Sequence, residues 1–270
     1  MRCRGDLVAH ANDMSEQLIL FEEFDGYAVI TLNRPEKLNA LSTPMVLELQ
    51  QRLDECKGTH SAIVVTARGK AFTAGVDLRE RNEWVRKGAK VRGDNVRNKW
   101  YDTMGTIIRN HPAIFIAAVN GLAVGGGATL VNICDLAIMS EDAQIGVPQI
   151  SWGIYPGIAG ASTQVRILRK HAAWPILTAR SLSAAEAVEV GLVNLTVPAD
   201  RLLDEAKALA AHIATLDPIA LDWCKKALDQ IPSHIGDWPV ALEYGRSVNN
   251  IIQDQIAARG SSSPASPAAA

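Results

Sequence analysis

Three short, nearly uninterrupted apolar runs constrain the fold of this 270-residue chain more than any other feature. They are AIVVTA at 62–67, AIFIAAVNG at 113–121 and CDLAIM at 134–139. A run of this length that is apolar on both faces predicts a strand covered on both sides of its sheet. Because segments of helical periodicity separate the runs, we expect βαβ units with right-handed crossovers, and therefore an α/β protein.

The segments around these runs are patterned as well. Two apolar runs within 18–32, on either side of residues 25–26, predict a β-hairpin. A helix is expected with Ser42 or Thr43 as its N-cap, because apolar residues at helical spacing follow from Met45 on. The segment 183–197 predicts a capped helix followed by a short strand.

The last part of the chain predicts a helical region that packs on the α/β core or against another subunit. Amphipathic helices are expected at 200–215, 217–230 and 238–257, with breaks at Asp217-Pro218 and Ile231-Pro232. We therefore divide the chain into a core at 15–200 and a C-terminal helical region at 201–257. The polar segment 1–14 and the Ser/Pro/Ala-rich tail 258–270 are expected to be disordered.

Composition excludes several classes of protein. With 48% apolar and 21% charged residues and a net charge of −2, the chain reads as a soluble globular protein without a nucleic-acid footprint. No apolar stretch is long enough for a membrane span, and the N-terminus lacks a secretory apolar region, so we expect a cytoplasmic protein. The four scattered cysteines and six histidines show no metal-ligand spacing, so no metal site is expected.

Two glycine-containing stretches carry the chemical argument. GKAFTAGVDL at 69–78 and NGLAVGGGATL at 120–130 each follow a predicted strand and precede a helical pattern. Small residues there let a ligand approach backbone N–H groups, so two such turns that face each other would form an anion hole. The Gly125-Gly126-Gly127 triplet fits neither a dinucleotide fingerprint nor a P-loop, and tight packing is its alternative reading.

One stretch of the chain is distinctly basic. Nine Lys/Arg and four Asp/Glu lie between Arg79 and Arg109. A solvated helix and loop would explain this charge, and so would attraction of a polyanionic ligand such as a phosphorylated cofactor.

Taken together, these segments resemble the crotonase (enoyl-CoA hydratase/isomerase) superfamily over roughly residues 15–257. The resemblance rests on six segments, which occur in the family's order and spacing: TLNRPEKLNAL (31–41), AFTAGVDL (71–78), AVNGLAVGGGATL (118–130), CDLAI (134–138), AQIGVPQISWGIYPGIAG (143–160) and AAEAVEVGLVNLTVP (184–198).

The resemblance implies a fold and an assembly. The fold is a spiral of ββα turns that forms two roughly perpendicular sheets, followed by a helical C-terminal region. The assembly is a homotrimer or a dimer of trimers, with the C-terminal helices in contacts. The family binds acyl-CoA thioesters, so coenzyme A enters as part of the substrate and no permanently bound cofactor, nucleic acid or membrane partner is expected.

The resemblance also implies residue roles. The N–H groups of Val76 and Gly126 would hold the thioester oxygen as it becomes an enolate or a tetrahedral oxyanion. Asp77 and Asp135 match family positions, where we expect them to cap backbone N–H groups. The residues expected to line the substrate and coenzyme A path are Leu38, Ala40, Ala74, Gly75, Asp77, Leu78, Gly125 and Pro148. Cations that could contact its phosphates are Lys37, Arg79, Arg81, Arg86, Lys87, Lys225 and Lys226.

The sequence departs from the family at the two glutamates that flank the water in hydratases. Thr129 and Gln149 stand at those positions, and neither side chain ionises near neutral pH. Tyr155 is a candidate replacement acid, with a packed turn aromatic as its alternative. Glu80 and Glu83 are candidates that solvated charges would also explain, and His111 is expected at a surface edge.

The sequence therefore predicts an acyl-CoA-processing enzyme that uses an oxyanion hole but is not an efficient hydratase. One alternative is a catalytically silent acyl-CoA-binding homologue. Another is a C–C bond hydrolase, lyase or decarboxylase acting on a coenzyme A ester. A weaker reading is a dinucleotide-binding protein built on the glycine triplet.

Overall fold

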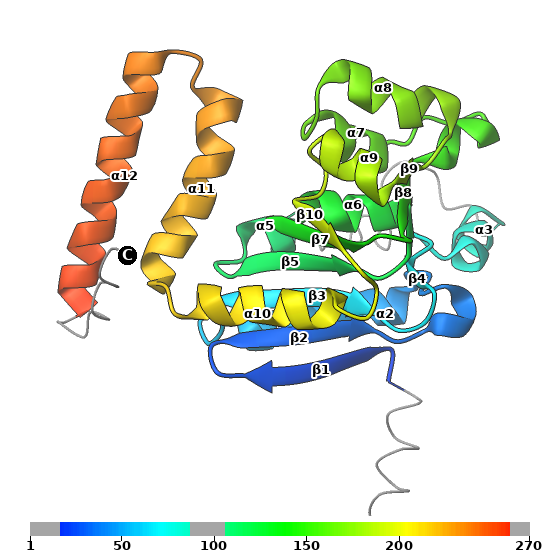
Figure 1. Ribbon diagram of the computed structural model, residues 1–270, viewed down its shortest axis with the longest axis horizontal. Coiled ribbons are helices and arrows are strands. Elements are labelled where there is room, and N and C mark those ends of the chain that lie inside the picture. Colours follow the sequence, from blue (N-terminus) through cyan, green and yellow to red (C-terminus); the bar gives the residue numbers. More distant parts are fainter. Residues whose placement is uncertain (1–16, 87–105, 260–270) are drawn as a thin grey trace, which may run out of the picture.

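The computed structural model describes residues 17–86 and 106–259. The predicted extension 1–14, the tail from residue 260 on and most of the basic stretch lie outside these residues. The described part consists of two β-sheets, helices around them and a helical C-terminal region (Figure 1). This arrangement confirms the α/β class and the two-sheet core expected from the sequence.

The larger sheet contains all three apolar runs. In spatial order its strands are β1 (Ile19–Phe24), β2 (Tyr27–Leu32), β3 (Ala62–Ala67), β5 (Ile114–Val119), β7 (Leu136–Ser140) and β10 (Leu195–Val197). Strands β1 and β2 form the predicted antiparallel hairpin, and Gly26 at its turn has φ +74°. All other neighbours in this sheet are parallel, as the predicted βαβ units require.

Both faces of the larger sheet are covered, which explains why its central strands are apolar throughout. In β3, Ile63 and Val65 point into the main core. On the other face, Ala62 and Val64 pack against α10 (Leu202–Ala214). The first C-terminal helix thus packs back on the α/β core, one of the two possibilities that its amphipathic pattern allowed.

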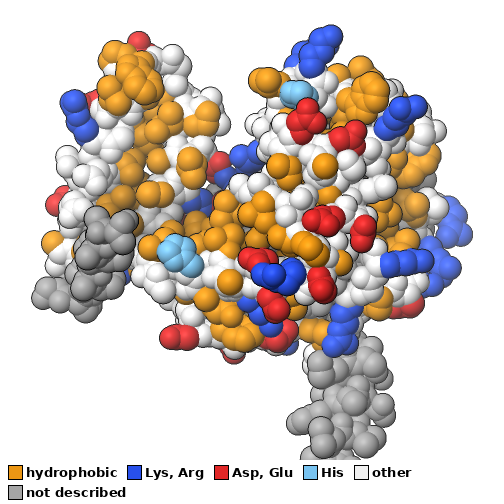
Figure 2. All heavy atoms as spheres, viewed as in Figure 1, with side chains coloured by type: hydrophobic (Ala, Val, Ile, Leu, Met, Phe, Trp, Pro, Cys, Tyr) orange, Lys and Arg blue, Asp and Glu red, His pale blue; other side chains and the backbone are white. Residues whose placement is uncertain are grey.

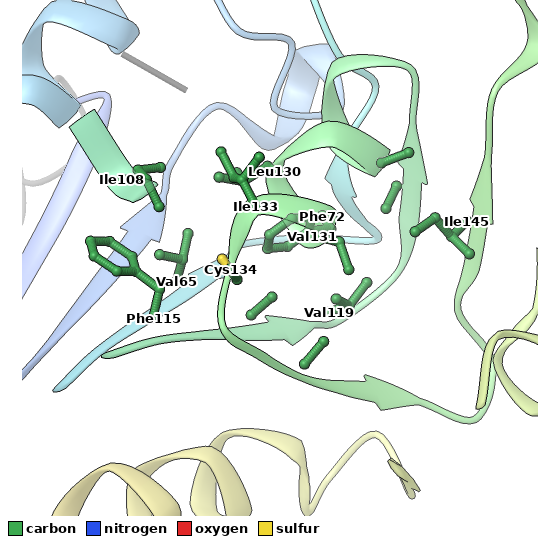
Figure 3. Close-up of a cluster of buried hydrophobic side chains, with 14 of the residues drawn as sticks. Val65, Phe72, Ile108, Phe115, Val119, Leu130, Val131, Ile133, Cys134 and Ile145 are labelled. Atoms are coloured by element: carbon green, nitrogen blue, oxygen red, sulfur yellow. The ribbon is translucent and has the colours of Figure 1, made fainter. Parts of the chain in front are cut away.

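The smaller sheet and a buried helix complete the core. The sheet is formed by β4 (Ala71–Thr73), β6 (Leu122–Val124), β8 (Gln144–Gly146) and β9 (Leu182–Ser183). Helix α6 (Gly126–Ile133) contacts strands of both sheets, and its Leu130, Val131 and Ile133 lie in the main core (Figure 3). Because α6 follows β6 almost directly, its first residue lies at the carboxyl end of this interior strand of the smaller sheet.

Shorter helices connect the strands. They are η1 (Pro35–Lys37), α2 (Thr43–Cys56), α3 (Leu78–Arg86), α5 (Ile108–Asn110), η3 (Pro148–Trp152), α7 (Ala159–Gln164), α8 (Arg169–Thr178) and α9 (Ala184–Glu189). Ser183 caps α9 and forms a reciprocal capping box with Glu186, which confirms the capped helix predicted there.

Two long antiparallel helices, α11 (Pro218–His234) and α12 (Trp238–Arg259), form what we call the helical arm. Figure 1 shows the arm standing apart from the two sheets, with only α11 approaching the core. The break predicted at Ile231-Pro232 is wrong, since α11 continues to His234. The carbonyl that loses its hydrogen bond to Pro232 belongs to exposed Leu228, where water can replace the bond. Within the described ranges, no helix is long and apolar enough to cross a membrane.

Candidate active site

The first glycine turn connects β4 to α3 and leaves one N–H group without an acceptor among the described residues. Leu41 donates to the Gly75 carbonyl at 2.7 Å and accepts from the Asp77 N–H at 3.1 Å. Because backbone direction alternates in such a parallel bridge, the N–H of Val76 points away from Leu41. Gly75 has φ +84°, and its own N–H donates to the Thr73 hydroxyl at 3.0 Å.

The second glycine turn connects β6 to α6. Gly125 has φ +57° and donates its N–H to the Gly146 carbonyl at 2.9 Å. Gly126 is the first residue of α6, so its N–H has no acceptor within the helix. Among residues 17–86 and 106–259, no protein acceptor is present for the N–H of Gly126 or of Val76.

The two glycine turns touch each other. A Cβ added at Gly75 would lie 2.7 Å from the carbonyl oxygen of Val124 and 2.8 Å from the nitrogen of Gly126. A Cβ added at Gly127 would lie 2.4 Å from the Thr73 carbonyl oxygen. Only glycine permits the two backbone segments to approach so closely, since both added Cβ atoms would overlap backbone atoms of the other segment. The structure therefore brings together the two stretches that the sequence singled out.

Thr129 and Gln149, where the resemblance implies the glutamates of hydratases, lie beside the second turn. Thr129 is only 1% exposed, and its hydroxyl donates to the Gly125 carbonyl at 3.3 Å. The Nε2 of Gln149 lies 3.1 Å from where a Cβ of Gly125 would be. The Oε1 of Gln149 is buried and has no hydrogen-bond partner in the part of the chain that is described. Both side chains are polar and uncharged, so no proton of theirs transfers readily near neutral pH.

A pocket of about 200 Å³ opens next to the first turn. Its lining residues are Lys37, Ala40, Ala74, Val76, Asp77, Leu78 and Arg79. Four of the residues expected along the substrate path are among them, together with two of the expected cations. Leu38 is not among the lining residues; it ends η1 with φ +51°. Pro148 is the first residue of η3, which carries Gln149.

Asp77 and Asp135 bind backbone N–H groups, in agreement with the predicted capping role. Asp77 accepts from the Arg79 N–H at 2.9 Å at the start of α3, and from Arg34 Nη1 at 2.6 Å. Partial burial tends to raise the pKa of Asp77, but these hydrogen bonds outweigh it and hold the pKa below its ordinary value. Asp135 accepts from the Phe115 N–H at 2.9 Å. An ionised Asp77 serves better as a structural acceptor than as an acid.

Three expectations about charged residues need correction. Glu80 accepts from the backbone N–H and the hydroxyl of Thr43, at 2.9 and 2.8 Å, so it caps α2 instead of standing in solvent or in the pocket. His111 is buried, and its Nε2 lies 3.0 Å from the Leu53 carbonyl oxygen, so the predicted surface position is wrong. Lys225 is buried as well, in a salt bridge of 2.9 Å to Asp135, and is not available to a phosphate.

Tyr155 lies in the loop between η3 and α7. Its side chain is 58% exposed, and its hydroxyl accepts a hydrogen bond from Gln164 Nε2 at 2.7 Å. The alternative that Tyr155 is a packed turn aromatic therefore holds only in part. Its hydroxyl is hydrogen-bonded, but its ring is exposed to solvent. The structure does not describe the side chains of Arg81 and Lys87, which were expected near a phosphate.

Comparison with known proteins places the chain in a family. The family described as Enoyl-CoA hydratase/isomerase matches residues 22–237. The chain belongs to the enoyl-CoA hydratase/isomerase family. The "Probable enoyl-CoA hydratase echA8" of Mycobacterium bovis is 36% identical over 80% of this chain and 83% of its own length. The hydroxycinnamoyl-CoA hydratase-lyase of Pseudomonas fluorescens is 32% identical over 73% and 72% of the two chains. The crystal structure of a Mycobacterium smegmatis enoyl-CoA hydratase superposes with a TM-score of 0.77 at 29% identity, covering 87% of this chain and 91% of that one.

Asn39 is a structural residue of this family member that sequence reasoning missed. It is fully buried with φ +52°, and its Nδ2 donates to the carbonyls of Arg68 and Ala71, both at 2.8 Å. Its own carbonyl accepts from the Thr73 hydroxyl at 2.6 Å. Asn39 therefore holds the first and last residues of β4, just before the first glycine turn. The sequence could have indicated this role, because asparagine adopts the left-handed conformation more readily than most residues.

Proposed function

We propose that this enoyl-CoA hydratase/isomerase family member binds an acyl-CoA thioester with its carbonyl oxygen between the N–H groups of Val76 and Gly126. The observation that carries the proposal is the contact between the two glycine turns. Each turn leaves one of these N–H groups without an acceptor in the described parts of the chain. Backbone donors held in this way need no reorganisation when negative charge develops on the oxygen. The oxygen would become an enolate or a tetrahedral oxyanion during the reaction.

The pocket beside Val76 supports a path for the coenzyme A part of the substrate. Its apolar side is formed by Ala40, Ala74 and Leu78, which suit a flexible thiol arm. Lys37 and Arg79 line the same pocket and would attract the phosphates. Coenzyme A would thus be held as part of the substrate and released with it.

The reaction itself would not be efficient hydration. A general acid or base is worth about 10²–10⁴ in rate, and Thr129 and Gln149 offer neither at the positions that flank the water in hydratases. The same uncharged pair favours a second candidate, a catalytically silent acyl-CoA-binding protein. A C–C bond hydrolase, lyase or decarboxylase remains a further candidate, with its acid or base placed elsewhere in the site.

The assembly and location follow as part of the proposal. We expect a homotrimer or a dimer of trimers with the helical arm at its contacts, and a cytoplasmic protein. Apolar side chains on the surface of the arm support such contacts (Figure 2). Trp238, the first residue of α12, is 74% exposed.

A panel of acyl-CoA thioesters, incubated with the protein and followed by mass spectrometry, tests the reaction. Hydration, isomerisation, decarboxylation and hydrolysis differ in product mass or retention. No turnover across the panel would favour the binding protein, and turnover of a plain enoyl-CoA at hydratase rates would contradict the proposal.

The position of the site is tested by Gly75→Ala, with Gly58→Ala as its matched control. Both glycines have φ near +80°, but a Cβ at Gly58 meets nothing within 4 Å whereas one at Gly75 meets the second turn. Calorimetry should show that Gly75→Ala lowers the affinity for a non-reactive acyl-CoA analogue far more than the affinity for free coenzyme A. Gly58→Ala should lower stability by about 1–2 kcal/mol without changing the preference for the acylated ligand. Equal effects of the two variants on that preference would place the site elsewhere.

A further inference from the structure

The two ends of α6 differ sharply in their hydrogen bonding. At the N-terminal end, the Gly126 N–H has no acceptor within the described residues. At the C-terminal end, two arginines bind the last carbonyls. Arg166 Nε donates to the Asn132 oxygen at 3.0 Å, and Arg109 Nη1 donates to the Ile133 oxygen at 3.1 Å. Because the last seven residues of α6 are buried, these guanidinium groups replace the water that an exposed helix end would bind.

Arg109 also connects α6 to the helical arm. Its Nη1 donates to Asp135 Oδ1 at 2.9 Å, and its Nη2 pairs with Asp229 on α11. Lys225, one turn earlier on α11, binds Asp135 Oδ2 and the Ala113 carbonyl, both at 2.9 Å. The guanidinium of Arg109 thus joins the end of α6 and a side chain of the arm in one contact.

The core side of the contact is largely closed to solvent, whereas the side chain of Asp229 on the arm is 36% exposed. The side chains of Lys225, Asp135 and Arg109 are 3%, 14% and 16% exposed. Burial lowers the pKa of Lys225, while its contact with Asp135 opposes that shift and favours the charged form. Buried charges that lose a partner are costly, so the geometry of such a cluster is strongly defined.

We propose that the helical arm positions the Gly126 N–H for the acyl thioester, by holding the far end of α6 through Asp229 and Arg109. The inference rests on the proposed function, because it concerns the same N–H group. α6 is one continuous helix of eight residues whose last seven are buried, so in this proposal a shift at Ile133 is transmitted along the helix to Gly126. The first turn lies so close to Gly126 that even a small shift changes how the two N–H groups converge. Asp229 and Arg109 are positioning residues in this account and do not touch the substrate.

The carbonyl stretching frequency of a bound thioester reports on this positioning. The probe is a saturated acyl-CoA carrying ¹³C at the thioester carbonyl, measured by isotope-edited infrared spectroscopy free and bound. Hydrogen bonds to the oxygen lower this frequency. Wild type should therefore show a downshift on binding, together with tighter binding of the acyl-CoA than of free coenzyme A.

Asp229→Asn removes the charge on the arm that Arg109 meets. It should reduce the downshift and lower the preference for acyl-CoA over coenzyme A by about 10-fold, less than the 10²–10³ effect of losing an oxyanion donor. Asp222→Asn is the matched control, since it removes the same charge from the same helix. Asp222 pairs with exposed Lys226 at 2.6 Å, away from Arg109. Any effect of this control on the coenzyme A phosphates cancels in the ratio of the two affinities.

Each outcome decides the inference. A wild type without any downshift would overturn both the proposed function and this inference. A wild-type downshift that Asp229→Asn retains as fully as Asp222→Asn would overturn the inference alone and leave Asp229 as a mere anchor of the arm. Arg109→Lys changes the partner of Asp229 on the core side of the contact. Lysine keeps the charge but has one nitrogen for three acceptors, so this variant should also reduce the downshift. It decides the question by the same two measurements if Asp229→Asn fails to fold.

Discussion

At the scale of single residues, the proposed site has Thr129 and Gln149 at the positions where the resemblance implies the glutamates of hydratases. If the proposed site is correct, the wild type should hydrate crotonyl-CoA more slowly than a hydratase with both glutamates, by a factor on the order of 10⁴ or more. The double variant Thr129→Glu plus Gln149→Glu places two carboxylates beside the second glycine turn. We expect a measurable rise in hydration in this variant, followed by the absorbance of the enoyl thioester.

Single variants and a matched pair provide the controls for this experiment. Each single glutamate should do little, because one group cannot both hold and deprotonate the water, and groups acting as a unit are not additive. Thr129→Gln plus Gln149→Glu has the same shape with one carboxylate fewer, so it should stay near wild type. Rapid hydration by the wild type would mean that another side chain supplies the acid or base.

His111 leads to a prediction about pH at the same scale. Its Nδ1 accepts the Ala113 N–H at 3.1 Å and its Nε2 faces the Leu53 carbonyl, an arrangement that only the neutral ring with hydrogen on Nε2 satisfies. Burial, helped by the charge of Lys225, lowers the pKa of His111. The unfolded state therefore binds the proton more readily than the folded state, and the free energy of unfolding should fall as pH drops through about 6.5.

Chemical denaturation between pH 7.5 and 5 measures this effect. His111→Gln should be less stable at pH 7.5 but should lose less stability on acidification than wild type. Exposed His212 is the control position, and His212→Gln should follow the wild-type curve. Carboxylates with lowered pKa, such as Asp77, contribute only at lower pH, as pH falls below about 4. An unchanged slope in His111→Gln would contradict the prediction.

At the scale of elements, Asp217 joins the two helices of the arm. Its Oδ1 accepts the N–H groups of Ile219 and Ala220, at 2.8 and 3.2 Å, and thereby caps α11. Its Oδ2 pairs with Arg259 at the end of α12. Asp217→Ala should lower the free energy of unfolding by about 0.5–2 kcal/mol for the cap alone. Asp217→Asn keeps an acceptor for the cap and loses only the ion pair, which is worth at most about 1 kcal/mol at a surface. Equal losses in the two variants, measured in urea, would show that the cap contributes nothing.

The elements that could be predicted are those whose local pattern agrees with their environment. β3 and β5 lie where uninterrupted apolar runs placed strands, because both of their faces are covered. The hairpin at Gly26 and the capped helix at Ser183 follow from turn and capping chemistry that acts within a few residues. The two glycine stretches were singled out because turns that faced each other would form an anion hole, and the structure brings them into contact.

What could not be predicted depends on partners far away in the chain. Glu80 caps α2 from 37 residues further on, and no local pattern reveals such a pairing. Lys225 looks like one of two adjacent solvent cations until the fold places Asp135 opposite it. Pro232 breaks helices in general, but it lies in the last turn of α11, where the lost hydrogen bond is easily replaced by water.

At the scale of the whole molecule, the compact two-sheet body contrasts with the helical arm. Figure 2 shows a hollow between the arm and the rest of the molecule, and apolar side chains on the arm itself. The arm carries its own hollow of about 530 Å³, lined in part by Trp238 and Leu242. An isolated chain would expose this apolar surface to water, which favours association of several copies.

Association through the arm leads to the last prediction. Sedimentation equilibrium of the wild type should give the mass of three or six chains. Leu242→Asp introduces a charge into the hollow on α12 and should shift the protein toward monomer while the circular dichroism of the two-sheet body is kept. Asn250→Asp adds the same charge to the same helix at an exposed position that does not line the hollow, so it should leave the mass unchanged. A monomeric wild type would contradict the proposed trimer, and a Leu242→Asp variant of unchanged mass would place the contact on another surface. Because the arm is also the element that holds α6 through Asp229, a monomeric Leu242→Asp variant with a weakened thioester downshift would connect assembly to the site.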